Sequence, residues 1–391
     1  MWGDIAIAFM IAFVTAFMAT PHTIKLAKKI GAVDTPNDER RINKVEMPRL
    51  GGIAVIGGFF ISIIYLLIVM TLENKIDLSE EGYTGKIIGF GLGALVLGIT
   101  CFIDDVKGIP AVVKLIGQTI AAVIVVNSGI RIDNLNIFFL NFNDAGNIFF
   151  TILTICWIIG ITNAINLIDG LDGLSTGISL ISCLSLVIIF SLNGSPLISI
   201  ILITALAGAL CGFLPYNFNP AKTFIGDTGS NFLGYCLSII SILGIAKTYT
   251  AIVIVAPLLV LALPIFDTIF AIVRRIIQGK SIKAIIKPDA GHLHHRMLKL
   301  GFTQKQAVFI MYGISAIFGM FAIILMDSGI WKALSFALII LLAIAFGYKE
   351  FFKQKLLVNN EEENENSKID GQIEIEEKNN IIDFEEKKKK A

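Results

Sequence analysis

Long apolar stretches alternate with short polar ones over most of the chain. A helix needs roughly 20 apolar residues to cross the hydrocarbon core of a bilayer, and eleven stretches reach or approach that length. The pattern predicts helices at about 3–24, 50–71, 86–103, 111–129, 148–165, 174–192, 196–214, 229–246, 250–272, 306–326 and 330–348. Pro257 and Pro264 fall inside the ninth stretch and predict a kink there. The chain is therefore expected to be an all-α polytopic membrane protein with about eleven transmembrane helices.

Composition agrees with this class. The 391 residues are 55% hydrophobic and 16% charged, and the mean hydropathy is +0.77, far from the average of soluble domains. Basic residues lie in short loops rather than along one exposed stripe, so nucleic acid is not an expected partner. All five cysteines fall within apolar stretches without a CxxC spacing, and we interpret them as small buried hydrophobic residues.

Lysine and arginine in the short loops predict the orientation. Loops 25–49 and 273–305 carry seven and eight basic residues, whereas the loops on the opposite side carry three in total. The bias predicts an external N-terminus and, with eleven spans, a cytoplasmic C-terminus. Residues 351–391 are rich in Glu, Asn and Lys, which predicts a disordered charged tail after a transmembrane domain at residues 1–350.

The polar segments that can carry chemistry all follow odd-numbered spans, which places them on the cytoplasmic face. Residues 163–173 contain two amides and two carboxylates, which are Asn163, Asn166, Asp169 and Asp172. Their spacing lets several of them share one helix face. Ionisable groups at a bilayer boundary are costly and indicate function; a polar loop between two spans is the alternative.

Two further acidic segments lie at the same membrane edge. Asp104 and Asp105 end the third predicted helix, near Lys114, and suit a hard cation or a general base; a solvated helix end is the alternative. Asp227 lies in the Gly-flanked segment 222–230 before the eighth helix. The backbone N–H groups of that segment suit a phosphate and Asp227 suits Mg²⁺; a simple helix cap is the alternative.

A basic cluster follows the ninth span. It consists of His292, His294, His295 and Arg296. Zinc is one interpretation of such a cluster, but the lack of nearby cysteine favours binding of a diphosphate, because arginine recognises phosphate oxygens with two hydrogen bonds. Asp267 lies inside the ninth stretch and is expected to form a structural ion pair with this basic loop.

Carboxylates, amides and cationic groups at one membrane edge suit the Mg²⁺-dependent transfer of a phosphoryl group between a soluble diphosphate and a lipid phosphate, with Mn²⁺ as an alternative ion. A transporter of lipids or ions is a second hypothesis, and it predicts polar groups on both faces and through several spans. A non-catalytic scaffold that docks through the tail is a third.

The ordered motifs resemble the polyprenyl-phosphate N-acetylhexosamine-1-phosphate transferases, which start the synthesis of lipopolysaccharide O-antigen, enterobacterial common antigen and wall teichoic acid. The matching segments are Pro48 to Gly52, Asp104-Asp105 with Lys114, and residues 163–173, 222–230 and 292–296. The resemblance implies that undecaprenyl phosphate attacks the sugar-linked phosphorus of a UDP-N-acetylhexosamine and that UMP leaves. It also implies a location in the bacterial inner membrane.

The resemblance assigns roles residue by residue. It implies a Mg²⁺ site at Asp227 and Asn166. It implies catalytic roles for Asp104, Asp105, Asp169 and Asp172. It implies substrate contacts from Lys114, Asn163, His292, His294, His295 and Arg296. We expect direct attack rather than a covalent aspartyl intermediate, because a phosphate monoester with a second pKa near 6 is already largely dianionic.

The histidine motif distinguishes two branches of these enzymes. Phospho-MurNAc-pentapeptide transferases usually have three consecutive histidines, whereas residues 292–296 read His-Leu-His-His-Arg. This order is similar to that of the N-acetylglucosamine-type members, so UDP-N-acetylglucosamine is the expected donor. A phospho-MurNAc-pentapeptide transferase is the alternative, and a homodimer is a candidate assembly.

Overall fold

The computed structural model describes residues 2–35, 46–74, 82–132, 144–245, 251–279 and 291–344. The chain forms two units, Met1–Gly329 and Ile330–Ala391. The described part of the second unit is one apolar helix, Ile330–Ile344. The predicted tail at 351–391 lies outside the described residues, as do residues 36–45 and 280–290 of the two basic loops.

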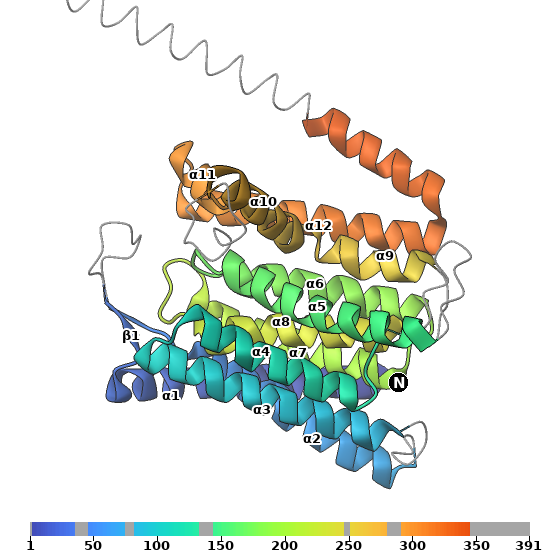
Figure 1. Cartoon of the computed structure of the whole chain (residues 1–391), viewed down its shortest axis with the longest axis horizontal. Helices are drawn as coiled ribbons and strands as arrows, with labels where there is room; N and C mark the ends of the chain where they lie inside the picture. Colours follow the sequence, from blue (N-terminus) through green and yellow to red (C-terminus); the bar gives the residue numbers. More distant parts are fainter. Residues whose placement is uncertain are drawn as a thin grey trace, which may run out of the picture. The chain divides into compact units, whose positions relative to one another are not determined.

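The first unit is a bundle of helices that run side by side (Figure 1). Its helices are α1 (Trp2–Ile30), α2 (Gly51–Leu72), α3 (Tyr83–Lys107), α4 (Ala111–Asn127), α5 (Asp144–Ile168), α6 (Leu174–Leu192), α7 (Leu197–Asn217), α8 (Gly226–Ile245), α9 (Ala251–Val260), α10 (Ala262–Gly279), α11 (Leu293–Lys299) and α12 (Gln304–Ser328). Among the described residues, seven helices are long and apolar enough to cross a bilayer, namely α1, α2, α3, α5 from Ile148, α6, α7 and α12. The prediction of an all-α polytopic membrane protein is confirmed, whereas the count of eleven and the orientation stay predictions.

The ninth predicted stretch is divided into two helices. α9 ends at Val260 and α10 begins at Ala262. Pro264 has no N–H to donate to the carbonyl of Val260, and this missing bond falls at the break. The expected kink is therefore a break at one residue, Leu261, and the bonds from Leu261 N to Pro257 O at 2.9 Å and from Ile265 N to Leu261 O at 3.2 Å continue across it. The short helix α11 was not predicted, because seven residues are too few to show a hydrophobic period.

The centre of the bundle is α7, which packs on α1, α2 and α6. Gly208 and Gly212 let α7 approach the α1 backbone, since a Cβ at either position would collide with the carbonyl of Phe9 or Phe13. The buried residues Ala8, Ala12 and Ala16 of α1, one turn apart, let α2 approach: a Cβ at Gly58 of α2 would meet Ala12 O and Ala16 Cβ, and Ser62 Oγ donates to Ala8 O at 2.7 Å. Small residues on facing helices are the usual way in which transmembrane helices pack closely.

The five cysteines are free thiols. Cys101, Cys183 and Cys236 are buried as predicted. Cys156 is exposed on the outer surface of α5, so the prediction is wrong for this residue. An apolar environment does not require burial within the protein in a helix whose outer face meets lipid, which is why hydropathy alone did not separate the two cases.

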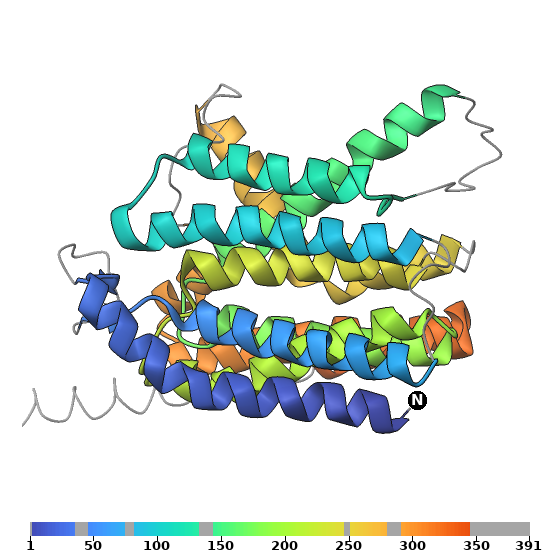
Figure 2. The same ribbon diagram turned by 90° about the horizontal axis from the view of Figure 1, so that it is seen from below.

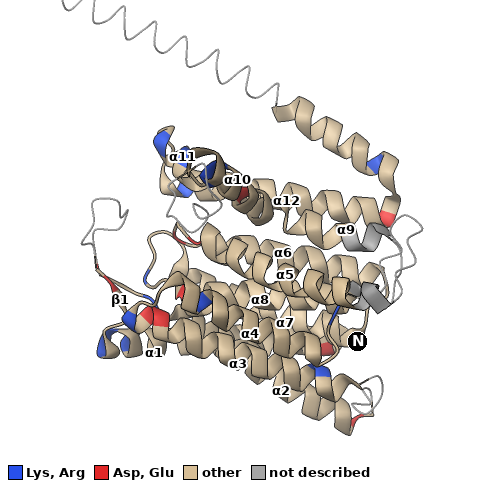
Figure 3. Ribbon diagram, viewed as in Figure 1, with Lys and Arg blue, Asp and Glu red and all other residues tan. Residues whose placement is uncertain are grey.

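Charged side chains of the described residues gather at the ends of the helices, above all at the end near β1 (Val33–Asp34) and α11 (Figure 3). At that end β1 pairs antiparallel with β2 (Met47–Pro48). The segment after β2 is tied to the start of α8. Gly51 N donates to Phe224 O at 3.0 Å and Gly52 N to Ile225 O at 2.8 Å. These bonds give the Pro48–Gly52 motif a structural role, because they fix both Arg49 and the first turn of α8.

Candidate functional site

The first turn of α8 is held by a carboxylate from another helix. Asp105, at the end of α3, accepts hydrogen bonds from Asp227 N at 2.8 Å, Thr228 N at 2.8 Å and Thr228 Oγ1 at 2.6 Å. The free N–H groups of a helix start and its positive dipole end are a favourable place for a carboxylate. Both oxygens of Asp105 are occupied in this way, so its observed contacts are those of a positioning residue.

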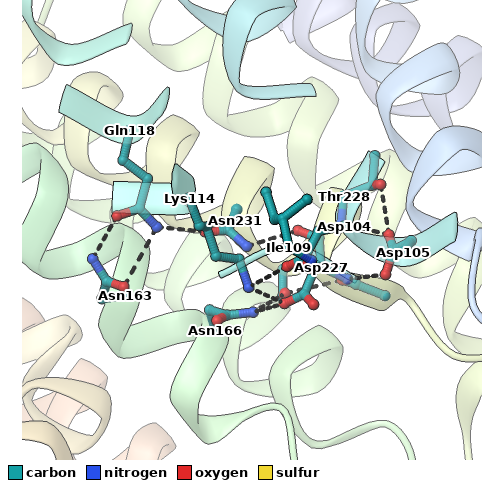
Figure 4. A network of polar contacts seen from close by, with 12 residues as sticks. Asp104, Asp105, Ile109, Lys114, Gln118, Asn163, Asn166, Asp227, Thr228 and Asn231 are labelled. Carbon is teal, nitrogen blue, oxygen red and sulfur yellow. Dashed lines mark hydrogen bonds and ion pairs between the residues drawn. The ribbon is translucent and has the colours of Figure 1, made fainter. Parts of the chain in front are cut away.

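Asp227 is the centre of a second set of contacts (Figure 4). Its Oδ1 accepts from Lys114 Nζ at 2.7 Å and from Asn166 Nδ2 at 2.6 Å. Lys114 Nζ also lies 2.9 Å from Asp104 Oδ2, so one ammonium neutralises two carboxylates from α3 and α8. Asp104 Oδ1 in turn accepts from Ile109 N at 2.9 Å. One network around Asp227 therefore joins residues of α3, α4, α5 and α8.

Three amide side chains extend this network into the bundle (Figure 4). Asn163 Nδ2 donates to Gln118 Oε1 at 2.8 Å, Gln118 Nε2 donates to Asn231 Oδ1 at 2.8 Å, and Asn231 Nδ2 donates to the carbonyl of Asp227 at 2.8 Å. Buried amides are costly unless paired, and each donor here has an acceptor. The chain of amides fixes α4 and α5 against the first turn of α8.

A polar cavity of about 340 Å³ opens beside Asp227. Its lining brings together five residues that the sequence analysis singled out, namely Asn166, Asp169, Asp172, Asp227 and His295. Arg49 and Gln304 line it as well, and Arg49 Nη1 lies 3.9 Å from Asp34 Oδ1 at the same wall. The cavity thus combines several carboxylates with an arginine, an amide and an imidazole, which is a donor set suited to phosphate esters and a divalent cation.

Asp169 and Asp172 are held differently within this cavity. Asp169 Oδ1 accepts from Ser175 Oγ at 2.6 Å. Burial raises the pKa of Asp169 to about 7, and the charges of Asp227 and Asp105 act in the same direction, while the bond from Ser175 opposes them. Asp172 Oδ2 accepts from Asn219 Nδ2 at 2.9 Å and from Ala221 N at 3.1 Å. Asp172 therefore orders the loop before α8, and Asp169 is the carboxylate whose charge changes near neutral pH.

The raised pKa of Asp169 predicts a pH dependence. We expect kcat/KM to rise as pH increases through about 7, where Asp169 becomes ionised, and the Asp169→Asn variant to lose this limb while it keeps a limb near pH 6 from the phosphate acceptor. The stability of the fold changes in the opposite sense. The folded chain keeps the Asp169 proton up to about pH 7, whereas the ordinary pKa of an aspartic acid is 3.8. The free energy of unfolding should therefore fall as the pH rises from 3.8 to about 7. An unchanged limb near pH 7 in the variant would refute the assignment.

The histidine cluster is divided between a structural pair and the cavity. His292 Nδ1 lies 2.8 Å from Asp267 Oδ2, and Leu293 N donates to Asp267 Oδ1 at 2.8 Å. The predicted structural ion pair of Asp267 thus has His292 as its partner. His294 is buried, and burial together with His295 and His292 lowers its pKa to about 3, which keeps its ring neutral. His295 is the member of the cluster that lines the cavity.

The remaining predicted site residues lie around the cavity rather than in its lining. Lys114 on α4 contacts Asp227 directly, Asp104 on α3 contacts Lys114, and Asn163 acts through Gln118. Arg296 lines a separate apolar groove on α10 and α12 together with Arg274. The roles of these residues toward substrate stay predictions.

Sequence reasoning missed Arg49, Gln118, Asn231 and Gln304 as members of the site. Arg49 lies in the matching segment Pro48 to Gly52, so its positive charge could have indicated a place in the site. Gln118 and Asn231 lie inside apolar helices, where a lone amide is a signal of its own because it is costly to bury. Gln304 Oε1 accepts a hydrogen bond from Asn219 Nδ2 at 2.9 Å. Because Gln304 directly follows Thr303, the capping residue of α12, its sequence position indicated only the start of a helix.

The donor set fits a magnesium ion that is completed by substrate. In the described part of the chain no group of three or more His, Cys, Asp or Glu residues is placed to hold a metal. Asp227 uses Oδ1 for Lys114 and Asn166, and within the described residues its Oδ2 accepts no hydrogen bond. Mg²⁺ commonly takes one or two protein carboxylates and fills its other positions with phosphate oxygens and water, which agrees with a cavity of this composition.

Comparisons with known proteins agree with the geometry. Residues 87–245 match the model of glycosyl transferase family 4. A probable undecaprenyl-phosphate N-acetylglucosaminyl 1-phosphate transferase of Bacillus subtilis (strain 168) is 38% identical over 338 residues, which cover 86% of this chain and 89% of that protein. A decaprenyl-phosphate N-acetylglucosaminephosphotransferase of Mycobacterium tuberculosis (strain ATCC 25618 / H37Rv) is 30% identical over 79% of each chain. A phospho-N-acetylmuramoyl-pentapeptide-transferase of Staphylococcus epidermidis (strain ATCC 12228 / FDA PCI 1200) is 32% identical over 61% of this chain and 74% of its own. The chain belongs to glycosyl transferase family 4.

Proposed function

We propose that the protein transfers N-acetylglucosamine-1-phosphate from UDP-N-acetylglucosamine to undecaprenyl phosphate. A phosphate oxygen of the lipid forms a bond to the sugar-linked phosphorus, the bond from that phosphorus to the bridging oxygen breaks, and UMP leaves with the electron pair. The products are UMP and N-acetylglucosaminyl-diphospho-undecaprenol. The observation that carries the proposal is the polar cavity at one end of an apolar helix bundle, which Asp227, Asn166 and further carboxylates line and beside which Lys114 contacts Asp227.

Catalysis of this kind is positioning and charge neutralisation. Lys114 and Arg49 offset the charge of two phosphate-bearing substrates that otherwise repel each other, and His295 and Gln304 offer further contacts along the cavity wall. Asp227 and Asn166 would hold a Mg²⁺ ion, which would supply Lewis-acid stabilisation of the phosphate oxygens. Asp105 and the amide chain hold the first turn of α8 in place. The dianionic lipid phosphate needs no strong base, so we favour direct attack.

The proposal includes the membrane setting. The cavity faces the cytoplasm, where nucleotide sugars are made, and the chain crosses a bacterial inner membrane eleven times with its N-terminus outside. The product is the first lipid-linked intermediate of an envelope polysaccharide or teichoic acid. The family relationship and the clustering of charge at one end of the bundle support this arrangement.

A panel of donors tests the proposed substrate. Purified protein is incubated with undecaprenyl phosphate and one UDP-sugar at a time, and UMP release is measured. We expect UDP-N-acetylglucosamine to give the highest kcat/KM. Preference for UDP-MurNAc-pentapeptide would instead favour the activity named for the Staphylococcus epidermidis relative, and no UMP from any donor would refute the transferase proposal.

Replacing Lys114 should separate charge from packing. In Lys114→Met the ammonium between Asp104 and Asp227 is lost, so two carboxylates face each other without a cation. We expect kcat/KM to fall by about 100-fold, the effect of removing one preorganised electrostatic partner. Lys107→Met, which removes an exposed ammonium at the end of α3, is the matched control and should stay within a few-fold of wild type. Equal losses in both variants would contradict the role of Lys114.

A further inference from the structure

A small hydrophobic core lies behind the turn at residues 169–173, which carries Asp169 and Asp172. Its buried members come from the turn and the residues on either side of it, from the start of α10, and from α11 and α12. They are Ile168, Leu171, Leu174, Ile178, Leu263, Met297, Ala307, Val308 and Met311. α12 lies along α6 (Figure 1, Figure 2), and the two helices pack on each other. The side of the 169–173 turn that faces away from the cavity is therefore supported by α12.

The helix that follows this turn, α6, begins without a side-chain cap. Its N-cap residue is Gly173, whose φ of 75° lies in the left-handed region. A polar side chain at the N-cap usually binds the first N–H groups of a helix, and glycine has none to offer. A Cβ at this position would be strained by that φ and would lie 3.3 Å from Tyr312 Oη and 3.4 Å from Phe218 Cα. The start of α6 therefore depends on contacts from elsewhere in the chain.

The hydroxyl of Tyr312 on α12 supplies such a contact. Tyr312 Oη donates a hydrogen bond to Gly173 O at 2.5 Å. The same carbonyl accepts from Gly177 N at 2.8 Å, which is the bond with which α6 begins. The ring of Tyr312 packs against Gly177, where a Cβ would lie 2.0 Å from Tyr312 Oη, so residue 177 must be glycine for the hydroxyl to reach Gly173. One carbonyl oxygen thus joins the 169–173 turn, the first turn of α6 and α12.

The first turn of α6 in turn orients Asp169. Ser175 lies in that turn, and its Oγ donates to Asp169 Oδ1 at 2.6 Å. The backbone of Asp169 has a longer bond, from Asp169 N to Asn166 O at 3.3 Å. The direction in which the carboxylate of Asp169 points into the cavity therefore depends on where the first turn of α6 lies, and Tyr312 helps to fix that turn.

α12 supports the second carboxylate of the turn as well. Asn219 Nδ2 donates at 2.9 Å both to Asp172 Oδ2 and to Gln304 Oε1. Gln304 and Tyr312 are eight positions apart, which corresponds to roughly 12 Å of helix and about two turns. The first two turns of α12 therefore contact the 169–173 turn and its neighbouring loop at two separate points.

We infer that Tyr312 is a positioning residue for the transfer: its bond to Gly173 O holds the 169–173 turn in the shape that presents Asp169 and Asp172 to the substrates. This inference rests on the proposed function. The alternative is a bond that stabilises the fold and does nothing for the reaction. The place of the bond favours positioning, because it lies one residue from Asp172 and acts on Asp169 through the turn that holds Ser175. A displacement of about 1 Å at reacting groups can cost roughly 100-fold in rate.

Removing the hydroxyl tests the inference by kinetics. Tyr312→Phe keeps the ring, so its packing against Gly177 and Phe309 is retained. We expect kcat to fall about tenfold, while the KM values for UDP-N-acetylglucosamine and undecaprenyl phosphate stay within about twofold, because the other walls of the cavity are unchanged. Tyr235→Phe is the matched control, since Tyr235 Oη also donates to the backbone of another helix, at 2.7 Å to Phe90 O, and neither residue lines the cavity. It should lower Tm by a similar amount and leave kcat within about twofold of wild type.

Hydrogen exchange tests the same bond without turnover. Amide exchange of the full-length protein is followed by mass spectrometry for wild type and both variants. We expect peptides from residues 168–178 to exchange about fivefold faster in Tyr312→Phe, as the loss of one hydrogen bond implies, while peptides from residues 226–238 exchange as in wild type. Tyr235→Phe should give the reverse pattern.

The outcomes separate this inference from the proposed function. An unchanged kcat in Tyr312→Phe, an equal loss of kcat in Tyr235→Phe, or wild-type exchange at residues 168–178 in Tyr312→Phe would each overturn the positioning role. A wild-type protein that releases no UMP would instead overturn the proposed function, and the exchange pattern would still report whether Tyr312 holds the 169–173 turn.

Discussion

Asp227→Asn should lower kcat/KM by about 1,000-fold. The substitution keeps the size of the side chain but removes the charge to which Lys114 and Asn166 bind at 2.7 Å and 2.6 Å. It also removes the carboxylate to which we assign the metal ion, so the loss combines weaker metal binding with a displaced Lys114. A single preorganised electrostatic group is worth about 100- to 1,000-fold in rate, and the double role of Asp227 places it at the upper end.

The control for this variant is another Asp→Asn change in the same cavity. Asp34 lines the cavity wall and lies 3.9 Å from Arg49. Asp34→Asn should reduce kcat/KM by less than about tenfold, because a partly exposed ion pair contributes little. Binding of UDP-N-acetylglucosamine in the presence of metal should weaken in Asp227→Asn and persist in Asp34→Asn. Full activity of Asp227→Asn would remove the basis of the metal assignment.

Removal of divalent metal should abolish transfer. Two substrates that each carry phosphate must approach each other beside Asp169, Asp172 and Asp227, and Lys114 and Arg49 alone leave this cavity with more negative than positive groups. We expect no measurable UMP release after treatment with EDTA and desalting, and full recovery on addition of Mg²⁺ or Mn²⁺.

The metal experiment requires a check on folding. Tm should change little on chelation, because the described contacts that hold α8 are made by Asp105, Lys114 and the amide chain. A large fall in Tm would indicate a structural ion instead. Transfer that continues at the original rate with substoichiometric metal would contradict the proposed use of Mg²⁺.

The lengths of the apolar stretches predict most of the helices, but they predict the site only in part. The predicted stretch at 174–192 coincides with α6, and every other predicted stretch overlaps a helix within the described residues. Two prolines marked the interruption between α9 and α10. The meeting of Asp227, Asn166 and Asp169 in one cavity could be predicted, because the alternation of loops places odd-numbered connections at the same end of the bundle.

Side-chain partners could not be predicted, because they depend on which helices are neighbours. The bond between Asp105 and the start of α8 joins residues 122 positions apart, and hydropathy contains no information on that pairing. Gln118 and Asn231 were overlooked because each is a single polar residue in an apolar helix. His292 was grouped with the phosphate-binding residues by sequence proximity, whereas its observed partner is Asp267.

Manganese bound in place of magnesium provides the most direct test of a single site that holds both the ion and the diphosphate. Electron paramagnetic resonance of the full-length protein with Mn²⁺ and UDP-N-acetylglucosamine should show one bound ion per chain, with ³¹P couplings from the nucleotide phosphates. The same signal should be absent in Asp227→Asn and retained in Asp34→Asn. A bound ion without ³¹P coupling, or an identical signal in Asp227→Asn, would contradict the account.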